Sequence, residues 1–172
     1  SLGCMAASFT QGKPAFLQYD DRLVELIAQL ENQAAELMLQ VDFDAKAVEE
    51  LAQAWALSKT NPARDAQIQA ATYAATKAPL AMMRALVQTI VLLEDLIGVC
   101  SRLLLSDVGT GALLCGAALQ AAALNVFVNT NCLVDTRQRT QIESECDEIL
   151  DRWLPRAHAL ATTVYEHIRT SR

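Results

Sequence analysis

The stretch "SDVGTGALLCGAALQAAALNVFVN", Ser106–Asn129, decides the fold, because everything between Thr110 and Asn125 except Gln120 is apolar, alanine or glycine. Such a run fits a membrane span, a core helix, or the floor of a site entered from the Ser106 end. Its apolar part is shorter than the roughly 20 residues that cross a bilayer, which favours a buried central helix. Its small residues also permit close contact with neighbouring helices or with a second subunit.

The composition of the whole chain also favours helix. Alanine and leucine dominate, and hydrophobic residues make up 52% and aromatic residues 5% of the 172 positions. Alanine and leucine lose little side-chain entropy in a helix, and this length suits one domain with a sizeable core. We therefore predict an all-α chain that folds as a compact up-and-down helical bundle, a single domain over residues 1–172.

Net charge and cysteine content limit the partners that this protein is expected to bind. The net charge of −6 repels nucleic acid and anionic membranes, so neither is an expected partner. The five cysteines are odd in number and form no C-x-x-C pair, which predicts reduced, buried thiols in a cytoplasmic protein. A nucleophilic cysteine is the alternative, with His158 or His167 as its partner. These histidines lie too far apart to coordinate one ion, so no metal site is expected.

Hydrophobic periodicity and helix-breaking residues divide the chain into helices. The opening "SLGCMAASF" lacks the features of a signal peptide and looks like a helix already under way, with residues missing before Ser1. Pro79 should kink or restart a helix and leave carbonyls that need other donors. Glu94 and Asp95 argue against a lipid-exposed span. Further helices are expected over 23–41, 42–58, 62–76 and 80–105. Another should run from a cap at Ser106 or Asp107 through the quoted stretch, and the last should cover 136–170 with a bend at Pro155. The apolar seam of the helix over 23–41 consists of Leu23, Ile27, Leu30, Ala34, Leu37 and Val41.

Four polar segments lie beside helix breaks, where capping side chains and free backbone groups collect. They are Gln11–Pro14, Asp42–Val48, Thr76–Arg84 and Leu103–Gly111. Taken alone, each has a structural explanation: Lys13 can cover a helix C-terminus, Asp44 can complement a helix dipole, Arg84 can be a solvated charge, and Ser106 and Asp107 can be a cap.

In combination, "FTQGK", "ATKAPL", "SDVG" and "ALNVFVN" resemble the cyclodeaminase/cyclohydrolase family of folate enzymes, over nearly the whole chain. That family comprises methenyltetrahydrofolate cyclohydrolases and the formiminotetrahydrofolate cyclodeaminase domain of bifunctional enzymes. The resemblance implies an all-α bundle that forms homodimers and binds a folate substrate in a cleft near helix ends. Hydrolysis by such an enzyme is expected to need no cofactor.

The family patterns fall on this chain residue by residue. They are L-T-x-G-K on Phe9–Lys13, D-x-x-A-F on Asp44–Val48, V-P-L on Ala78–Leu80, S-D-x-G on Ser106–Gly109 and L-N-V-x-x-N on Leu124–Asn129. Phe9 replaces the usual leucine and Val48 the usual aromatic residue. Cys100 and Ser101 stand where many members have G-N, which puts the shape of the cleft in question. The family's G-G-G-S loop, expected before Ser1, is absent, which indicates truncation, disorder or a degenerate enzyme.

The resemblance implies hydrolysis of 5,10-methenyltetrahydrofolate to 10-formyltetrahydrofolate. Asp107 is the expected base and the negative charge beside the cationic carbon, and Ser106 with the amides around Gly109 orients water or a carbonyl. Lys13 polarises the formyl oxygen or holds the water. Further candidates for substrate binding are Asp44, Arg84 or Lys59 at the anionic tail, Gly109, Asn125 and Asn129. The alternatives are a formiminotetrahydrofolate cyclodeaminase, which releases ammonia, and a non-catalytic helical dimerisation or binding module.

Overall fold

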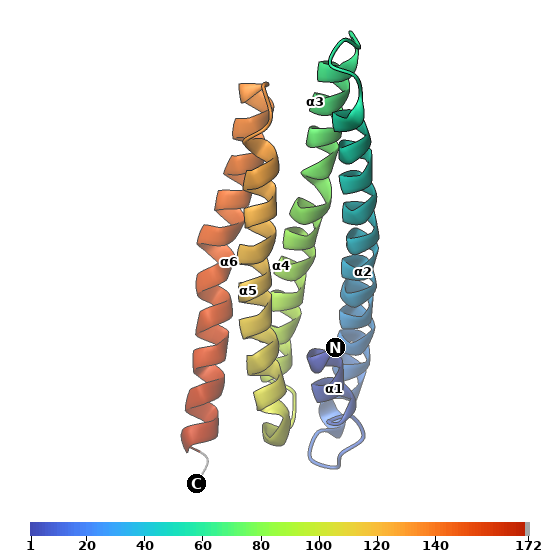
Figure 1. The fold of residues 1–172 in the computed structure, drawn as a ribbon. Helices are drawn as coiled ribbons and strands as arrows, with labels where there is room; N and C mark the ends of the chain where they lie inside the picture. The colour runs from blue at the N-terminus through green and yellow to red at the C-terminus, as the bar shows by residue number, and fades with distance from the viewer. Residues whose placement is uncertain (171–172) are drawn as a thin grey trace.

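The computed structural model describes residues 1–170, and these form α-helices and two short 3-10 turns without any strand (Figure 1). The predicted all-α class is confirmed. The elements are α1 (Leu2–Ser8), η1 (Leu17–Tyr19), α2 (Asp20–Ala56), α3 (Arg64–Ala75), α4 (Lys77–Ile97), η2 (Arg102–Leu104), α5 (Leu105–Thr130) and α6 (Thr136–Thr170).

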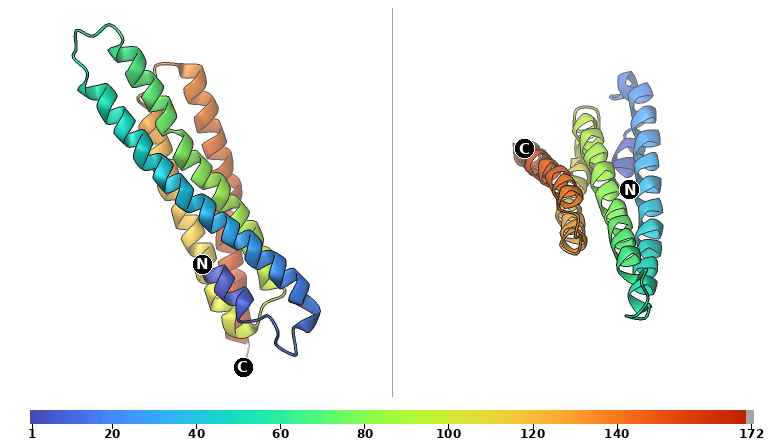
Figure 2. Two further views of the ribbon diagram at one scale, coloured as in Figure 1. Left: turned by 90° about the vertical axis from the view of Figure 1, so that its right-hand side faces the viewer. Right: turned by 90° about the horizontal axis from the view of Figure 1, so that it is seen from above.

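The long helices alternate in direction, so the bundle runs up and down as predicted (Figure 1). Helix α2 rises, α3 and α4 descend one after the other, α5 rises and α6 descends. Helix α4 packs against α2 on one side and against α5 and α6 on the other (Figure 2). The short α1 lies at the lower end, in contact with α2 and α5.

The core follows α4 along its length. Leu23, Leu26 and Leu30 of α2 are buried, as are Met83, Ile90 and Leu93 of α4 and Val108, Leu119 and Val126 of α5. Burying one such side chain contributes roughly 1.5–3 kcal/mol. The two acids of α4 pair with arginines of its neighbours: Asp95 lies 2.5 Å from Arg22 of α2, and Glu94 pairs with Arg156 of α6. These pairs explain how two carboxylates fit an otherwise apolar helix.

The predicted break between residues 41 and 42 is wrong, because α2 is one helix from Asp20 to Ala56. Acidic residues favour a helix start, but no glycine or proline interrupts this segment, so the helix continues. The predicted seam packs against the core as far as Leu37 but is wrong at its last position. Gln40 is buried, whereas Val41 is 52% exposed.

The connection between α4 and α5 also differs from the prediction. Helix α4 ends at Ile97 rather than near Leu105, and the turn η2 leads into α5. Since α5 begins at Leu105, Ser106 and Asp107 lie inside its first turn, and neither side chain forms a cap hydrogen bond. The last helix begins at Thr136 as predicted, and the Asp135 side chain accepts the N–H groups of Arg137 and Gln138. Pro155 lies inside α6, which continues through it.

Helix α5 is only partly buried. Val108, Ala112, Leu119 and Val126 are buried, but Leu124 is 67% exposed. One segment of the described chain, Arg102–Thr130, is long and apolar enough to cross a membrane by length and composition, a test that core helices also pass. The expected burial of this helix therefore holds for one of its sides.

Candidate functional site

A buried threonine of the predicted Phe9–Lys13 motif is hydrogen-bonded to the connection that precedes the predicted Ser106–Gly109 motif, at the lower end of the bundle. The Oγ1 atom of Thr10 donates to the carbonyl of Ala6 at 2.7 Å and accepts the N–H of Ser101 at 2.9 Å. Thr10 has no exposed surface. These bonds tie the end of α1 to the connection between α4 and α5 and thus bring the Lys13 loop and the start of α5 to one end. We call this end, with Thr10, Lys13, Ser101 and Asp107, the clamp end.

Gly12 fixes the loop that carries Lys13. Its φ of +74° lies in the left-handed region that favours glycine. Its N–H donates to Asp20 at the start of α2, at 3.0 Å. The Lys13 side chain is partly buried and forms no hydrogen bond or ion pair with the residues described. An unpaired, partly buried ammonium group is available to a ligand.

Asp107 is the matching acid at the clamp end. It lies in the first turn of α5, where free amides favour negative charge. Its carboxylate is partly buried and has no hydrogen bond or ion pair among residues 1–170. Burial, with a smaller contribution from the Asp107 charge, raises the pKa of nearby Cys100 to about 11. Ser106 is exposed beside it. The clamp end therefore carries a lysine, an aspartate and a hydroxyl group, and neither of the two charges has a partner in the part of the chain that the structure describes.

Gly109 packs closely against α6. A Cβ atom at Gly109 would lie 2.8 Å from Cγ1 of Val164, so its lack of a side chain lets α6 approach α5. It is the fifth residue of α5, and the amides left free at a helix start belong to the first turn. The free amides near Gly109 are thus those of the residues that precede it, and its contact with a substrate stays a prediction.

Asn129 pairs with the break that Pro79 causes. Proline at position 79 has no N–H to donate to the carbonyl of Ala75, four residues earlier. The side-chain amide of Asn129 donates to that carbonyl at 2.9 Å. The predicted need for a substitute donor is confirmed, and the donor is Asn129. The side-chain NH₂ group of Asn129, a candidate substrate-binding residue, is thus engaged in joining α5 to the α3–α4 junction.

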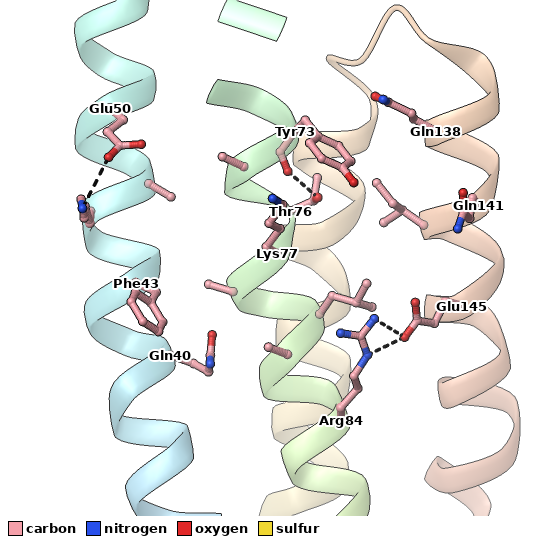
Figure 3. Close-up of a pocket in the computed structure, with 17 residues that line it drawn as sticks. Gln40, Phe43, Glu50, Tyr73, Thr76, Lys77, Arg84, Gln138, Gln141 and Glu145 are labelled. Carbon is pink, nitrogen blue, oxygen red and sulfur yellow. Dashed lines mark hydrogen bonds and ion pairs between the residues drawn. The ribbon is translucent and has the colours of Figure 1, made fainter. Parts of the chain in front are cut away.

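A separate groove of about 620 Å³ opens between α2, the α3–α4 junction and the first half of α6 (Figure 3). This volume is in the range of small-molecule sites. Aromatic side chains from α2 and α3, Phe43 and Tyr73, face it together with glutamines from α2 and α6. Its charged residues are Lys46, Glu50, Lys77, Arg84 and Glu145.

The cations of the groove have partners. Nε and Nη2 of Arg84 both lie 2.6 Å from Oε1 of Glu145, and this hydrogen bond raises the pKa of Arg84. The ammonium of Lys77 lies 5.1 Å from the centre of the Tyr73 ring. Lys46 is 3.9 Å from Glu50. Two of the three cations in the groove therefore pair with an acid, and the third, Lys77, lies over an aromatic ring.

The structure does not bring all the predicted site residues together. Lys13, Ser106 and Asp107 belong to the clamp end, and Arg84 belongs to the groove. Asp44 is partly buried on α2 next to the groove residue Phe43, but it does not line the groove. Lys59 is exposed in the connection between α2 and α3, and Asn125 is exposed on α5.

The two ends of α5 cannot meet around one small molecule within one chain. Asp107 and Asn129 are about 33 Å apart along the helix, because each residue rises about 1.5 Å. A single cleft formed by all the predicted residues is therefore excluded for the isolated chain.

Sequence analysis missed Tyr73, Gln138 and Glu145 as groove residues. Glu145 faces Arg84 from a helix 61 positions further along the chain, and no local pattern signals such a pair. The spacing of four between Tyr73 and Lys77 was the one local signal available, since such residues are neighbours on a helical surface.

The cysteines form no disulfide in the structure. Cys100, Cys115 and Cys146 are buried, and burial raises the pKa of each thiol to about 11, so a nucleophilic thiolate at these positions is disfavoured. The predicted burial is wrong for Cys132, which is exposed just beyond α5.

Comparison with known proteins identifies the family. The family model described as formiminotransferase-cyclodeaminase matches residues 1–148. A curated protein named methenyltetrahydrofolate cyclohydrolase, from Methylorubrum extorquens, is 30% identical over 99% of this chain and 82% of its own length. The crystal structure of a formiminotetrahydrofolate cyclodeaminase from Thermotoga maritima has the same fold, with a TM-score of 0.81, 22% identity, and coverage of 98% of this chain and 80% of that one. The chain therefore belongs to the folate cyclohydrolase/cyclodeaminase family.

Proposed function

We propose that this protein is a methenyltetrahydrofolate cyclohydrolase that works as a cytoplasmic homodimer without a cofactor. The relative that is 30% identical over nearly the whole chain carries this name. The observation that carries the proposal is a lysine and an aspartate at one end of the bundle, both partly buried and both without an ionic partner among residues 1–170. Burying a charge is costly unless something compensates it, and a bound substrate would do so.

In the proposed reaction, water adds to the cationic carbon that bridges N5 and N10 of 5,10-methenyltetrahydrofolate. Asp107 accepts a proton from this water and stabilises the cation before attack. The neutral adduct then loses its hydroxyl proton while N5 gains a proton and the carbon–N5 bond breaks. The formyl group stays on N10, and one proton is released per turnover. Lys13 polarises the oxygen as it becomes the formyl carbonyl, and Ser106 orients the water.

The remaining candidates would bind the rest of the substrate. Arg84 suits the anionic tail because its guanidinium can exchange Glu145 for a substrate carboxylate. Lys59 is the other candidate for the tail, and Asp44 and Asn125 would donate or accept hydrogen bonds. Arg84 lies about 20 Å along α4 from the end of that helix at Ile97, at about 1.5 Å per residue. The tail and the reacting carbon would thus occupy different levels of the bundle.

The alternative is a formiminotetrahydrofolate cyclodeaminase, in which N10 attacks the formimino carbon and ammonia leaves. The fold shared with the Thermotoga maritima cyclodeaminase favours this activity. Both reactions need acid–base groups beside the same carbon, so Lys13 and Asp107 would serve either.

Assays of both substrates distinguish these proposals. The cyclohydrolase is expected to remove the absorbance of methenyltetrahydrofolate above the spontaneous rate and to release no ammonia from formiminotetrahydrofolate. Ammonia release with formation of methenyltetrahydrofolate would establish the cyclodeaminase instead. If the folded protein turns over neither substrate, the non-catalytic binding module becomes the better account.

A further inference from the structure

Helix α2 carries an apolar stripe on its upper half that no other part of the described chain covers. Its residues follow one another at alternating steps of three and four, the spacing that places side chains along one side of a helix. They are Met38, Val41, Ala45, Val48, Ala52 and Trp55, and we call them the α2 stripe. All six are exposed, the four large ones by 52–68%. Arg64 packs over the Trp55 ring at 5.2 Å and still leaves this side chain 54% exposed.

The lower half of α2 shows that the same side of the helix receives another helix. Each residue of the α2 stripe from Val41 onward has an apolar residue 18 positions before it, and 18 residues make about five whole turns. These lower residues are Leu23, Ile27, Leu30, Ala34 and Leu37. Helix α1 lies beside only this lower part (Figure 1), and a Cβ atom at Gly3 of α1 would lie 3.0 Å from Cδ1 of Leu30. The α2 stripe therefore continues a helix-packing surface beyond the end of its cover.

The α2 stripe has the dimensions of a helix-binding site. It extends about 26 Å from Met38 to Trp55, at about 1.5 Å per residue. Ala45 and Ala52 stand between larger side chains, which leaves holes for the side chains of an approaching helix. A continuous exposed apolar row of this length is typical of a surface that binds another protein.

The charged residues that border the α2 stripe are all acidic. In a heptad with Met38 at position a and Val41 at position d, the bordering e and g positions carry Asp42, Asp44 and Glu49 and no lysine or arginine. Asp42 and Glu49 are exposed and form no ion pair with residues 1–170. Charges at e and g select the partner of a packed helix, so these acids favour a partner with lysine or arginine at the facing positions.

The same acids disfavour two other occupants. A second copy of this chain, docked through the same stripe, would place acidic positions opposite one another, and like charges so placed are destabilising. An anionic membrane would be repelled by these residues and by the net charge of −6.

We infer that the α2 stripe docks a basic amphipathic helix of another protein, with apolar residues at its a and d positions and lysine or arginine at e and g. The inference does not depend on the proposed function, because no residue of the α2 stripe belongs to the clamp end or lines the groove.

Two synthetic peptides test the partner chemistry on the whole chain. Both have about three heptads with leucine at a and d, and they differ only in carrying lysine or glutamate at e and g. The fluorescence anisotropy of the labelled lysine peptide should rise when the protein is added at low salt, and binding should weaken as salt is raised. The glutamate peptide should bind at least about tenfold more weakly.

Substitutions on α2 locate the bound peptide. Val41→Gln with Val48→Gln makes the α2 stripe polar without adding charge and should weaken binding of the lysine peptide at least about tenfold. The matched control is Val24→Gln with Leu39→Gln, at α2 residues that are 51% and 46% exposed outside the stripe, and it should bind normally. Circular dichroism checks that both variants remain folded.

Reversal of the bordering charges tests specificity. Asp42→Lys with Glu49→Lys should exchange the preference, so that the glutamate peptide binds more tightly than the lysine peptide. Equal affinity of the wild type for the two peptides would contradict a basic partner, and so would a preference that survives the reversal.

Four further results would overturn the inference. If the folded wild type binds neither peptide at low salt, the α2 stripe does not accept a helix. If Val41→Gln with Val48→Gln leaves binding unchanged, the peptide lies elsewhere. If the same variant lowers the mass of the protein in light scattering without peptide, the α2 stripe is a contact between copies of the chain. If it abolishes association with phosphatidylcholine vesicles, the occupant is lipid.

Discussion

The clamp end and the groove differ in how the chain satisfies their charges. At the clamp end, Lys13 and Asp107 are partly buried and have no partners among the described residues. In the groove, Arg84 pairs with Glu145, and Lys77 lies over the Tyr73 ring. The groove of about 620 Å³ thus lies where each cation already has a partner within the chain. Cavity size and uncompensated charge therefore point to different regions of this molecule, and the proposed chemistry follows the uncompensated charges.

The largest expected effect follows from removing the acid of the clamp end. Asp107→Asn should lower kcat for methenyltetrahydrofolate by about 10²- to 10⁴-fold, the usual contribution of a general base. The decrease in substrate absorbance measures this, and unchanged circular dichroism shows that the fold is retained. Glu50→Gln in the groove is the matched control and should keep nearly full activity. A slow Glu50→Gln enzyme beside a normal Asp107→Asn enzyme would reverse the assignment of the two regions.

The hydrogen bonds of Thr10 should hold the clamp end together. Thr10→Val keeps the shape of the side chain but leaves the Ser101 N–H without its acceptor, which costs about 1–3 kcal/mol. Thermal unfolding should show a Tm several degrees lower, whereas Thr10→Ser, which keeps the hydroxyl, should lose less. Equal Tm values for Thr10→Val and the wild type would show that the bond contributes nothing to stability.

Gly109 tests whether the S-D-x-G motif is partly structural. The methyl group of Gly109→Ala would collide with Val164, and overpacking of this kind typically costs about 1–3 kcal/mol. Alanine favours helix by about 1 kcal/mol over glycine, so the net loss should be smaller. Val164→Ala removes the closest contact, at 2.8 Å, but keeps its Cβ 3.1 Å from the added methyl, so the loss caused by Gly109→Ala should become smaller in this background, as measured by urea denaturation. An equally large loss in that background would contradict the packing explanation.

The smallest effect is expected in the groove. The Arg84 and Glu145 side chains are 57% and 39% exposed, and pairs at such sites contribute about 0–1 kcal/mol. Arg84→Met should therefore leave stability nearly unchanged. If Arg84 binds the folate tail, KM should rise while kcat stays within about two-fold, because remote binding lost equally from ground and transition states alters KM alone. A large fall in kcat with constant KM would place Arg84 in the chemistry and weaken the contrast between the regions.

The sequence was sufficient for the helical class, the start of α6, and the need to satisfy the carbonyls freed by Pro79, since these depend on local composition and periodicity. It was insufficient where tertiary packing decides. The break expected near Asp42 is absent because nothing opposes helix propagation there, and Gly109 faces Val164, which lies 55 positions away. The motifs identified Lys13, Arg84 and Asp107 as candidates. Only the structure separates them into a clamp end with unpaired charges and a groove with paired ones.

Lys13 and Asp107 are proposed to act on the same reacting carbon, and a double-mutant cycle in kcat measures whether they do. Groups that work as one unit show strongly non-additive losses, so Lys13→Met with Asp107→Asn together should be hardly slower than Asp107→Asn alone. Rates of methenyltetrahydrofolate loss by the wild type, both single variants and the double variant provide the cycle. Losses that simply multiply would show that the two residues act independently and would contradict a shared site at the clamp end.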